Sequence, residues 1–396
     1  MLIGVVGKPN VGKSTFFKAA TLAEVEIANY PFATIKPNSA VGYVKIDCVD
    51  KFFNTQCNPR TGYCSNHHRF IPVQMMDVAG LVPGAHKGLG MGNQFLDDLR
   101  QADVLVHVID VSGSTNEKGE PIAPLSYDPA EDIKFLEVEL DMWYFQILKK
   151  GWEKFARTIQ QTKGEISQAL AKQLSGLKVE EEQVKDVLKK LELSEDIISW
   201  QEDELMLIAK ELRKVSKPMI IAANKIDVNG VEKNLDRLRK EFPDYIIIPC
   251  SAESELALKE ASRHNLIEYV PGENNFKILS ELNDKQEKAL KFIKDNILDK
   301  FGSTGVQKVI NSSVFDLLKY IAVYPGGVNK LADSEGNILP DCFLLPDGST
   351  ALDFAYKLHT DFGKNFIRAI DVKTKQTIGK EHKLKHLDVI EIISNK

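Results

Sequence analysis

The chain has 396 residues, of which 43% are hydrophobic and 27% charged, and its formal net charge at pH 7 is -5. This length is sufficient for two or three domains with sizeable cores. The slight negative charge argues against a protein that binds nucleic acid over its whole surface, and no run of residues approaches the roughly 18 uninterrupted apolar residues of a membrane-spanning helix, so we expect no membrane partner.

The first predicted element is a phosphate-binding loop between a buried strand at residues 2–6 and a helix that begins near residue 15. The loop fits the pattern G-x-x-x-x-G-K-[ST], in which backbone N–H groups and the helix N-terminus surround phosphate oxygens. The nucleotide-binding residues predicted here are Gly7, Lys8, Pro9, Asn10, Val11, Gly12, Lys13, Ser14 and Thr15. We expect Lys13 to be catalytic by reaching the β- and γ-phosphates, and the Ser14 hydroxyl to bind Mg²⁺. A chance glycine turn is the alternative, and the strand before it and the helix after it argue against that reading.

Two later stretches are predicted to complete the Mg²⁺ site. Residues 29–34 contain a proline that excludes a helix, so they form an exposed loop in which Thr34 can bind Mg²⁺ when the γ-phosphate is present. Residues 70–76 are predicted to form a strand that ends at Asp77, which begins a D-x-x-G pattern. The carboxylate of Asp77 can hold Mg²⁺ through water, and the N–H of Gly80 can sense the γ-phosphate and so take part in catalysis.

A glycine-dense loop follows at residues 81–93, and it is expected to change order with the nucleotide. Leu81 stands where a side chain often orients the attacking water, and leucine cannot do this. Intrinsic hydrolysis is therefore predicted to be slow or to use another group. His86 is the nearby titratable candidate for catalysis, and an ordinary solvated loop histidine is the alternative.

The cysteines form an odd and scattered set, which is typical of a reducing cytoplasm and not of a disulfide framework. They are Cys48, Cys57, Cys64, Cys250 and Cys342. Because nothing resembling a signal peptide precedes the first strand, we expect a cytoplasmic protein. Cys57, Cys64, His67 and His68 together could bind zinc. Their spacing is loose, however, and an ordinary surface hairpin is the alternative.

The hydrophobic period changes after an apolar strand at residues 104–111 and a linker at residues 112–128. Apolar residues then recur at helical spacing, which predicts a helical hairpin or coiled-coil-like insert over residues 128–214. Its aromatic run at residues 143–145 is expected to belong to the core, and its charged runs to a solvated face. The insert either binds a partner or spaces two domains.

The stretch after the insert is predicted to recognise the base. A buried strand at residues 219–223 leads to Asn224-Lys225-Ile226-Asp227, and a second strand leads to Ser251 and Ala252. The Asp227 carboxylate can accept hydrogen bonds from N1–H and the 2-amino group of guanine, which adenine does not offer as a pair. We expect Asn224 to brace the loop and reach N7, the stem of Lys225 to cover the ring, and the N–H of Ala252 to donate to O6.

The C-terminal part is predicted to form a separate small domain. A helix capped by Ser349 or Thr350 lies between strands, which is typical of a ubiquitin-like α+β sheet. The predicted fold is therefore an α/β P-loop GTPase domain with a mostly parallel sheet, a helical insert and this α+β domain. The predicted boundaries are residues 1–127 and 215–275 for the GTPase domain, 128–214 for the insert, 276–316 for a helical connector and 317–396 for the last domain.

Taken together, these motifs resemble those of a translation-factor-class GTPase of the Obg superfamily, and of its YchF-like branch in particular. The resemblance rests on residues 7–15, 30–34, 77–93 and 95–100. It implies an apolar residue where the catalytic glutamine would stand, which Leu81 satisfies. Asn10 matches the loop asparagine of potassium-activated GTPases, which implies that K⁺ can supply the charge of an arginine finger. The branch usually departs from N-K-x-D and then favours ATP, whereas this chain keeps that motif.

The stretch from residue 346 to 370 resembles a TGS domain, and that resemblance implies contact with RNA, often on ribosomes. Five lysines near the end of the chain give local support, because phosphate contacts need cations. They are Lys373, Lys375, Lys380, Lys383 and Lys385. A solvated lysine face without RNA is the alternative.

The sequence therefore predicts a cytoplasmic, monomeric GTPase that uses Mg²⁺, hydrolyses GTP slowly to GDP and phosphate, and acts on the ribosome or RNA as a switch. One alternative is an ATP-hydrolysing protein of the same branch. Another is a nucleotide-gated module that binds RNA or ribosomes and whose hydrolysis is incidental.

Overall fold

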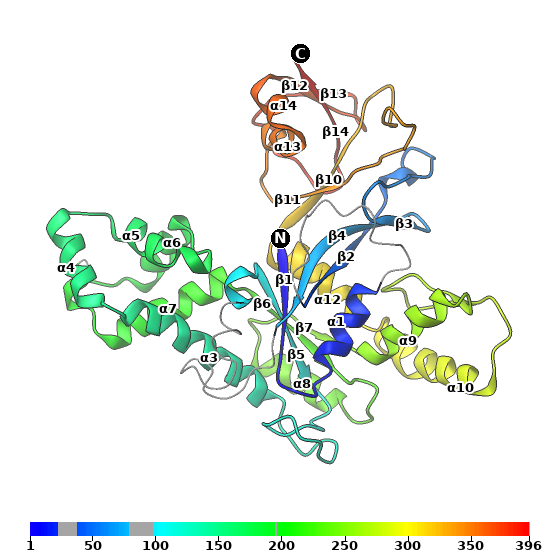
Figure 1. Cartoon of the computed structure of the whole chain (residues 1–396), viewed down its shortest axis with the longest axis horizontal. Coiled ribbons are helices and arrows are strands. Elements are labelled where there is room, and N and C mark those ends of the chain that lie inside the picture. The colour runs from blue at the N-terminus through cyan, green and yellow to red at the C-terminus, as the bar shows by residue number, and fades with distance from the viewer. Residues whose placement is uncertain (23–37, 79–97, 195, 396) are drawn as a thin grey trace.

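The structure, a computed structural model, describes residues 1–22, 38–78, 98–194 and 196–395. It has a central α/β domain, a helical arm that projects from one side of it, and a small C-terminal domain beyond the amino end of the first strand (Figure 1). Within the described ranges, no helix is both long and apolar enough to cross a membrane.

In the part of the chain that the structure describes, the central sheet has seven strands, of which five run parallel. Its order is β2-β4-β1-β5-β6-β7, with β3 paired to β4, and β2 and β3 are antiparallel to β4. The strands are β1 (Leu2–Val6), β2 (Ser39–Asp47), β3 (Tyr63–Ser65), β4 (His68–Asp77), β5 (Val104–Asp110), β6 (Met219–Asn224) and β7 (Ile247–Pro249). The mostly parallel sheet predicted from the sequence is confirmed.

Both faces of this sheet are covered, as expected for strands that are apolar along their whole length. In β5, Leu105 and Ile109 enter one core, whereas Val106 and Val108 enter the other, because successive side chains point to opposite faces. Helices α1 (Lys13–Thr21) and α12 (Val306–Ser312) cover one face, and α3 (Ala130–Lys149) and α8 (Glu232–Glu241) cover the other. Beside them lie α9 (Ala252–Arg263), β8 (Ile267–Glu268), β9 (Lys277–Ile278), α10 (Asp284–Ile293) and α11 (Asp299–Phe301).

The arm contains more than the predicted helical hairpin. Helix α3 leads outward and α7 (Glu202–Ser216) packs along it on the way back. Between them lie α4 (Trp152–Thr162), α5 (Ile166–Gln173) and α6 (Glu181–Leu191). The charged run predicted to be a solvated face forms α6, which still buries Val184 and Val187. Trp143, Tyr144 and Phe145 are buried in the core, as predicted.

A buried arginine fixes the base of the arm to the central domain. The Nε of Arg213 in α7 donates to Asp141 Oδ1 in α3 at 2.8 Å, and its Nη1 donates to the hydroxyl of Tyr245 just before β7. Tyr245 in turn donates to Glu137 Oε1 of α3 at 2.5 Å. Because Arg213 is only 1% exposed, its charge is satisfied by protein groups and not by water, which holds the two long helices in one register.

The C-terminal domain has the ubiquitin-like topology that the sequence predicts. Its strand order is β11-β10-β14-β12-β13, in which the parallel pair β10–β14 lies between antiparallel pairs. The elements are β10 (Tyr320–Pro325), β11 (Phe343–Pro346), α13 (Ala351–Leu358), α14 (Thr360–Lys364), β12 (Phe366–Asp371), β13 (Gln376–Ile378) and β14 (Val389–Ser394). Of the two predicted caps, Thr350 is the one that accepts from the backbone of α13.

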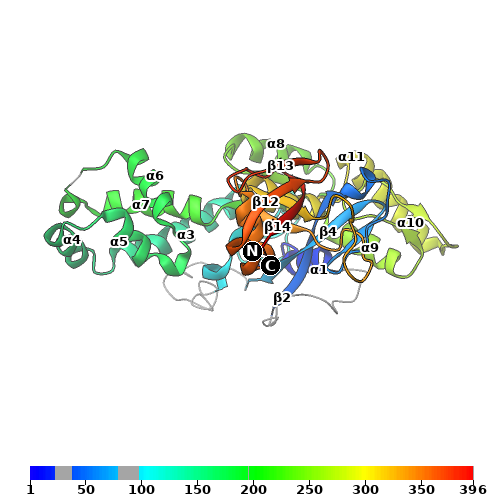
Figure 2. The same cartoon turned by 90° about the horizontal axis from the view of Figure 1, so that it is seen from above.

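The C-terminal domain shares a core with the central domain. Tyr324, Leu339 and Val389 belong to the same buried cluster as Ile71 and Val73 of β4. Figure 2, seen from above, places this domain over the middle of the molecule, with the arm on one side and α10 on the other. The two domains therefore bury apolar surface against each other, which favours a fixed relative position.

Candidate nucleotide-binding site

The predicted nucleotide-binding residues gather at the carboxyl ends of the parallel strands, where ligands bind in open α/β sheets. Val5 at the end of β1 is in register with Asp77 at the end of β4. Asp110 at the end of β5 is in register with Asn224 at the end of β6. Segments that are far apart in the sequence are therefore brought to one edge.

Two glycines allow the loop after β1 to fold against its neighbours. A Cβ on Gly7, whose φ is +156°, would lie 2.5 Å from the carbonyl oxygen of Val108. A Cβ on Gly12, whose φ is +92°, would lie 2.2 Å from Nδ2 of Asn224. Both positions exclude a side chain, and Gly12 is the N-cap of α1, so the loop delivers the N–H groups of a helix N-terminus to this edge.

Lys13, Ser14 and Asp77 form the polar centre of the site. The ammonium of Lys13 lies 2.5 Å from Asp77 Oδ1, and the Ser14 hydroxyl donates to Asp77 Oδ2 at 3.3 Å. A hydroxyl and a carboxylate side by side are the oxygen donors that Mg²⁺ prefers, so these residues fit a Mg²⁺ site. The other members of the predicted centre, Thr34, Gly80 and His86, lie outside the described residues, and their roles stay predictions.

The side chain of Lys8 does not point to the nucleotide edge, although Lys8 is part of the predicted loop. Its ammonium is buried, lies 2.8 Å from Asp132 Oδ1 of α3 and donates to the carbonyl of Thr115. It also lies 3.9 Å from the centre of the Tyr127 ring. Only the main chain of Lys8 is left for a phosphate, and its charge ties the loop to the base of the arm.

Pro9 and Asn10 form the exposed corner of the loop. The segment that follows β5 contacts this corner. Asn10 has a left-handed φ of 62°, and its Nδ2 donates to the carbonyl of Gly119 at 2.9 Å. A Cβ on Gly119 would lie 2.5 Å from the carbonyl oxygen of Pro9. The side-chain oxygen of Asn10 therefore stays available for a ligand, and it is the atom that would make the predicted contact with K⁺.

Asn224 braces the base-recognition loop, as predicted. Its Nδ2 donates to the carbonyl of Val11 at 2.9 Å, and its Oδ1 accepts from the N–H of Ala252 at 3.0 Å. The second contact uses the Ala252 N–H that we expect to donate to guanine O6, and that donation stays a prediction. The amide is satisfied on both sides and joins three segments of the site.

Asp227 is oriented by Ser251, whose hydroxyl donates to Asp227 Oδ1 at 3.1 Å. Among the residues that the structure describes, Oδ2 of Asp227 has no partner, so it can accept from a base. Lys225, at a left-handed φ of 69°, lies with its ammonium 2.9 Å from Asp110 Oδ2. Burial raises the pKa of Asp110, but hydrogen bonds from Ser112 and Lys225 outweigh it and hold that pKa below its ordinary value. The charged carboxylate thus anchors the stem of Lys225.

Asp110 and Asp132 were not predicted from the sequence to belong to this region. The position of Asp110 at the end of a buried strand was an available signal, because Asp77 was recognised at the same kind of position. Asp132 gives no such signal, since it stands in the first turn of α3, where acidic residues are common for helix stability alone.

The residues suggested for zinc binding are only partly brought together. Cys57 and Cys64 lie close to each other, and they are joined by Cys48 and Asp50, which were not in the predicted set. His67 contacts Asp50 from outside, and its Nδ1 lies 2.9 Å from Oδ1. His68 lies elsewhere, beside Asp47 of β2.

Three family models match successive parts of the chain. They are described as a 50S ribosome-binding GTPase over residues 2–137, an Obg-like GTPase YGR210-like, G4 motif-containing domain over residues 222–327, and a TGS domain over residues 334–394.

Similar proteins match nearly the whole chain. An uncharacterized GTP-binding protein of Methanocaldococcus jannaschii is 52% identical, with 99% of each chain covered. A ribosome-binding ATPase YchF of Pasteurella multocida is 31% identical, with 92% of this chain and 86% of the relative covered. The crystal structure of a GTP binding protein from Pyrococcus horikoshii OT3 matches with a TM-score of 0.80 at 43% identity, over 100% of both chains. The Schizosaccharomyces pombe YchF GTPase shares the fold, with a TM-score of 0.59 at 22% identity over 99% and 97% of the two chains.

Proposed function

The chain belongs to the YchF-like family of P-loop GTPases, and from this premise we propose that it hydrolyses GTP slowly, with Mg²⁺, as a switch that acts on the ribosome or RNA. Membership supports nucleotide binding and nucleotide hydrolase chemistry in general. The choice of GTP, the slow rate and the ribosomal action go beyond family membership, and each of them rests on particular residues.

The choice of GTP rests on one observation, the orientation of Asp227. Ser251 holds one carboxylate oxygen at 3.1 Å, which leaves the other to accept from the N1–H and 2-amino group of guanine. Adenine presents no matching donor pair, and a buried acceptor without donors costs affinity. The sequence supports the same choice, because the chain keeps Asn224, Lys225 and Asp227.

The phosphate end would be served by Lys13, Ser14 and Asp77. Lys13 is placed to counter the charge of the terminal phosphate, and its present contact with Asp77 Oδ1 keeps it at the nucleotide edge. Ser14 and Asp77 would hold Mg²⁺, which in such sites bridges phosphate oxygens and reduces their charge. The Asn10 side-chain oxygen is the atom that would contact K⁺. Slow turnover is proposed because Leu81 cannot orient a water molecule.

The partner is proposed to be the ribosome or its RNA. The match to a TGS domain supports this, as does the name of similar proteins, ribosome-binding ATPase YchF. Among the five C-terminal lysines, Lys375, Lys380, Lys383 and Lys385 are exposed. Lys373 lies 5.7 Å from the centre of the exposed Phe52 ring, so a cation and an aromatic face are both available to RNA.

The first experiment measures dissociation constants of GTP, ATP and xanthosine triphosphate by calorimetry, for the parent and for Asp227→Asn. Losing one charged acceptor should cost GTP roughly 1–3 kcal/mol, which is about tenfold or more in affinity, and should favour the xanthine nucleotide. Asp236→Asn on the exposed face of α8 is the matched control, and its GTP affinity should equal that of the parent. Repeating the series in K⁺ and in Na⁺ tests Asn10.

An ATPase is the second candidate, because the relatives at 28% to 31% identity are named ATPases. If the parent binds ATP as tightly as GTP, and Asp227→Asn changes neither, the base assignment fails and the ATPase becomes the favoured candidate.

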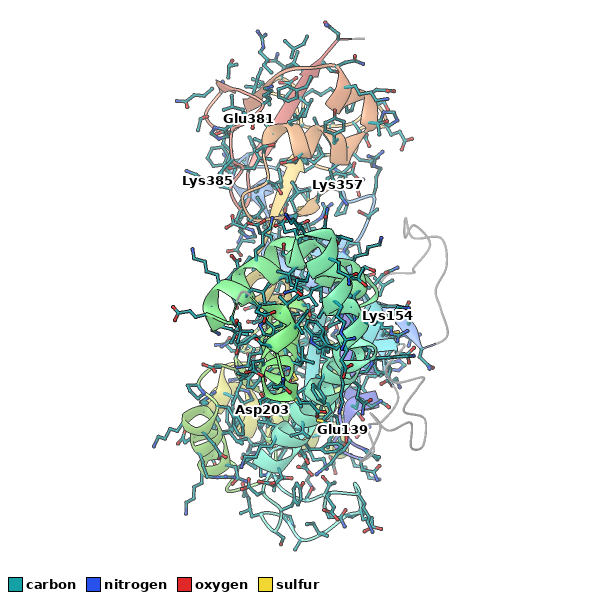
Figure 3. The ribbon with its side chains drawn as sticks, turned by 90° about the vertical axis from the view of Figure 1, so that its left-hand side faces the viewer. Glu139, Lys154, Asp203, Lys357, Glu381 and Lys385 are labelled. Atoms are coloured by element: carbon teal, nitrogen blue, oxygen red, sulfur yellow. The ribbon has the colours of Figure 1, made fainter. Side chains whose placement is uncertain are left out.

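Ribosome binding is tested by co-sedimentation in GDP, in a non-hydrolysable GTP analogue and without nucleotide. A switch changes affinity between these states, whereas a module with incidental hydrolysis does not. Figure 3 shows Lys385 on the C-terminal domain and Lys154 on the arm. If the C-terminal domain is the contact, Lys385→Glu weakens binding and Lys154→Glu does not, and the opposite result assigns binding to the arm.

A further inference from the structure

Three cysteines and an aspartate converge at the opposite end of β4 from the nucleotide site. The side-chain ligand atoms of Cys48, Asp50, Cys57 and Cys64 all lie within 4.8 Å of one another. The Sγ atoms of Cys48 and Cys57 are 3.4 Å apart, and Cys64 Sγ lies 3.8 Å from Asp50 Oδ2. Cys64 is partly exposed whereas the other three residues are buried, so an ion can enter past Cys64.

These spacings are those of a tetrahedral metal site. Zinc–thiolate bonds of about 2.3 Å place the sulfur atoms at the corners of a tetrahedron whose edges are about 3.8 Å. We propose that Cys48, Asp50, Cys57 and Cys64 bind one zinc ion. Thiolates select a soft or borderline metal over Mg²⁺ or Ca²⁺, and four protein ligands leave no open position, so the ion is structural.

The surroundings of the site supply the positive charge that a negatively charged metal centre needs. Arg69 is 0% exposed, and among the described residues it has no carboxylate partner. Its Nη1 lies 3.7 Å from Cys57 Sγ and also donates to the carbonyl of Leu339 at 3.1 Å. A buried guanidinium without an anion is costly, and a zinc centre with three thiolates and a carboxylate carries net negative charge.

The carboxylate ligand is itself oriented from outside. His67 Nδ1 donates to Asp50 Oδ1 at 2.9 Å, which leaves Oδ2 directed toward the thiols. The N–H of Cys57 also donates to this Oδ2, at 3.1 Å. Such outer contacts fix the geometry of ligands in metal sites. His67 therefore has a role at this centre without being a ligand.

The zinc would hold the loop on which the C-terminal domain docks. Within residues 48–67, the N–H of Asn58 donates to the carbonyl of Ile338 at 2.8 Å, and that of Arg60 to Pro340 at 3.0 Å. Arg69 Nη2 donates to Pro340 as well, at 2.8 Å. Within this loop, Cys48, Val49 and Cys57 are the buried members of the shared core, and a metal bound to two of them would add order to the rest of the loop. The ten residues of β4 separate this loop from Asp77 by about 30 Å.

The test begins with metal content, measured by mass spectrometry on the full chain purified without a histidine tag or chelator. The expected result is about one zinc per chain. After removal of zinc, Co²⁺ should produce the thiolate charge-transfer and visible bands of a tetrahedral site. Cys64→Ser should lose the metal, whereas Cys342→Ser, the same change at a buried thiol outside the set, should keep it.

Hydrogen exchange then separates docking from general folding. Removal of zinc should raise exchange at residues 48–67 and 337–342 and leave GTP affinity unchanged, because the nucleotide edge is distant. The cobalt spectrum is measured on the parent protein, so this part of the test does not depend on whether a variant folds. The proposal is overturned if the parent binds neither zinc nor cobalt under reducing conditions, or if Cys64→Ser retains the ion. A thiol count of three in the denatured parent, in place of five, would mean that Cys48 and Cys57 form a disulfide and would equally overturn it.

Discussion

Replacing Lys8 with methionine tests whether this residue of the phosphate loop serves the arm and not the nucleotide. The side chains of Lys8 and Asp132 are 5% and 6% exposed, and their charged atoms lie 2.8 Å apart. Methionine keeps the length of the stem but removes the ammonium. Of the partners among the described residues, Asp132 then retains only the hydroxyl of Tyr127, which donates to Oδ1 at 3.1 Å, so an uncompensated carboxylate stays buried.

The expected cost is large and depends on pH. Leaving one member of a buried pair without its partner costs about 3–5 kcal/mol. Burial already raises the pKa of Asp132 in the parent, although hydrogen bonding to Lys8 opposes it. Without Lys8 this pKa rises further, so the folded variant holds a proton that the unfolded chain releases near pH 4. Stability therefore falls as pH rises above that value, by up to 1.4 kcal/mol for each pH unit, until the folded pKa is passed.

Urea unfolding, monitored by tryptophan fluorescence, measures this loss of stability in the arm. The three tryptophans are Trp143, Trp152 and Trp200, and all lie in the arm that α3 supports. We expect Lys8→Met to lose about 3–5 kcal/mol at pH 8 and clearly less at pH 5. Lys134→Met, on the exposed side of the same helix, is the control and should hardly move the urea midpoint.

A loss below about 1 kcal/mol at pH 8 would show that the pair contributes no more than a surface contact. A loss that does not shrink at pH 5 would show that the Asp132 carboxylate is not the group left uncompensated. The double variant Lys8→Met with Asp132→Leu should recover most of the stability, because removing both charges leaves no buried ion. GTP affinity should change little in all three variants, since no side-chain contact with the nucleotide is lost.

Two further predictions concern close packing and domain docking. Gly12→Ala should weaken GTP binding at least tenfold in calorimetry, because its Cβ would lie 2.2 Å from Asn224 Nδ2, whereas Gly151→Ala, with φ +76° but no atom of the described residues within 4 Å of its Cβ, should leave affinity intact. Arg69→Met should destabilise the docked C-terminal domain by about 3 kcal/mol or more, since it breaks charged hydrogen bonds in a buried place. Arg60→Ala removes exposed ion pairs and should cost less than about 1 kcal/mol; equal losses in thermal unfolding would contradict this distinction.

Local sequence patterns were sufficient to predict features that depend on residues close together in the chain. The phosphate loop could be placed because its glycines, strand and helix are contiguous, and Asp77 and Asp227 because each follows a buried strand. In the C-terminal domain, apolar runs between turns at residues 320–324, 367–371 and 389–393 indicate strands, and β10, β12 and β14 lie within one residue of these bounds. Within the predicted helical connector, the polar run at residues 278–301 indicates one long helix, and this expectation was less accurate. The helix begins only at Asp284, where Asn283 caps it, and a π-helical turn at Lys294–Leu298 interrupts it.

From the sequence alone we obtained the family, the fold class and the positions of the motif residues. The three-dimensional packing set what each side chain contacts. It directed Lys8 to Asp132, more than 120 positions away, and the N–H of Ala252 to Asn224. It also gathered Cys48, Asp50, Cys57 and Cys64, whose irregular spacing carries no motif. The physical reason is that a motif fixes the backbone over a few residues, whereas burial, ion pairing and metal geometry depend on which distant segments the sheet and its connections place side by side.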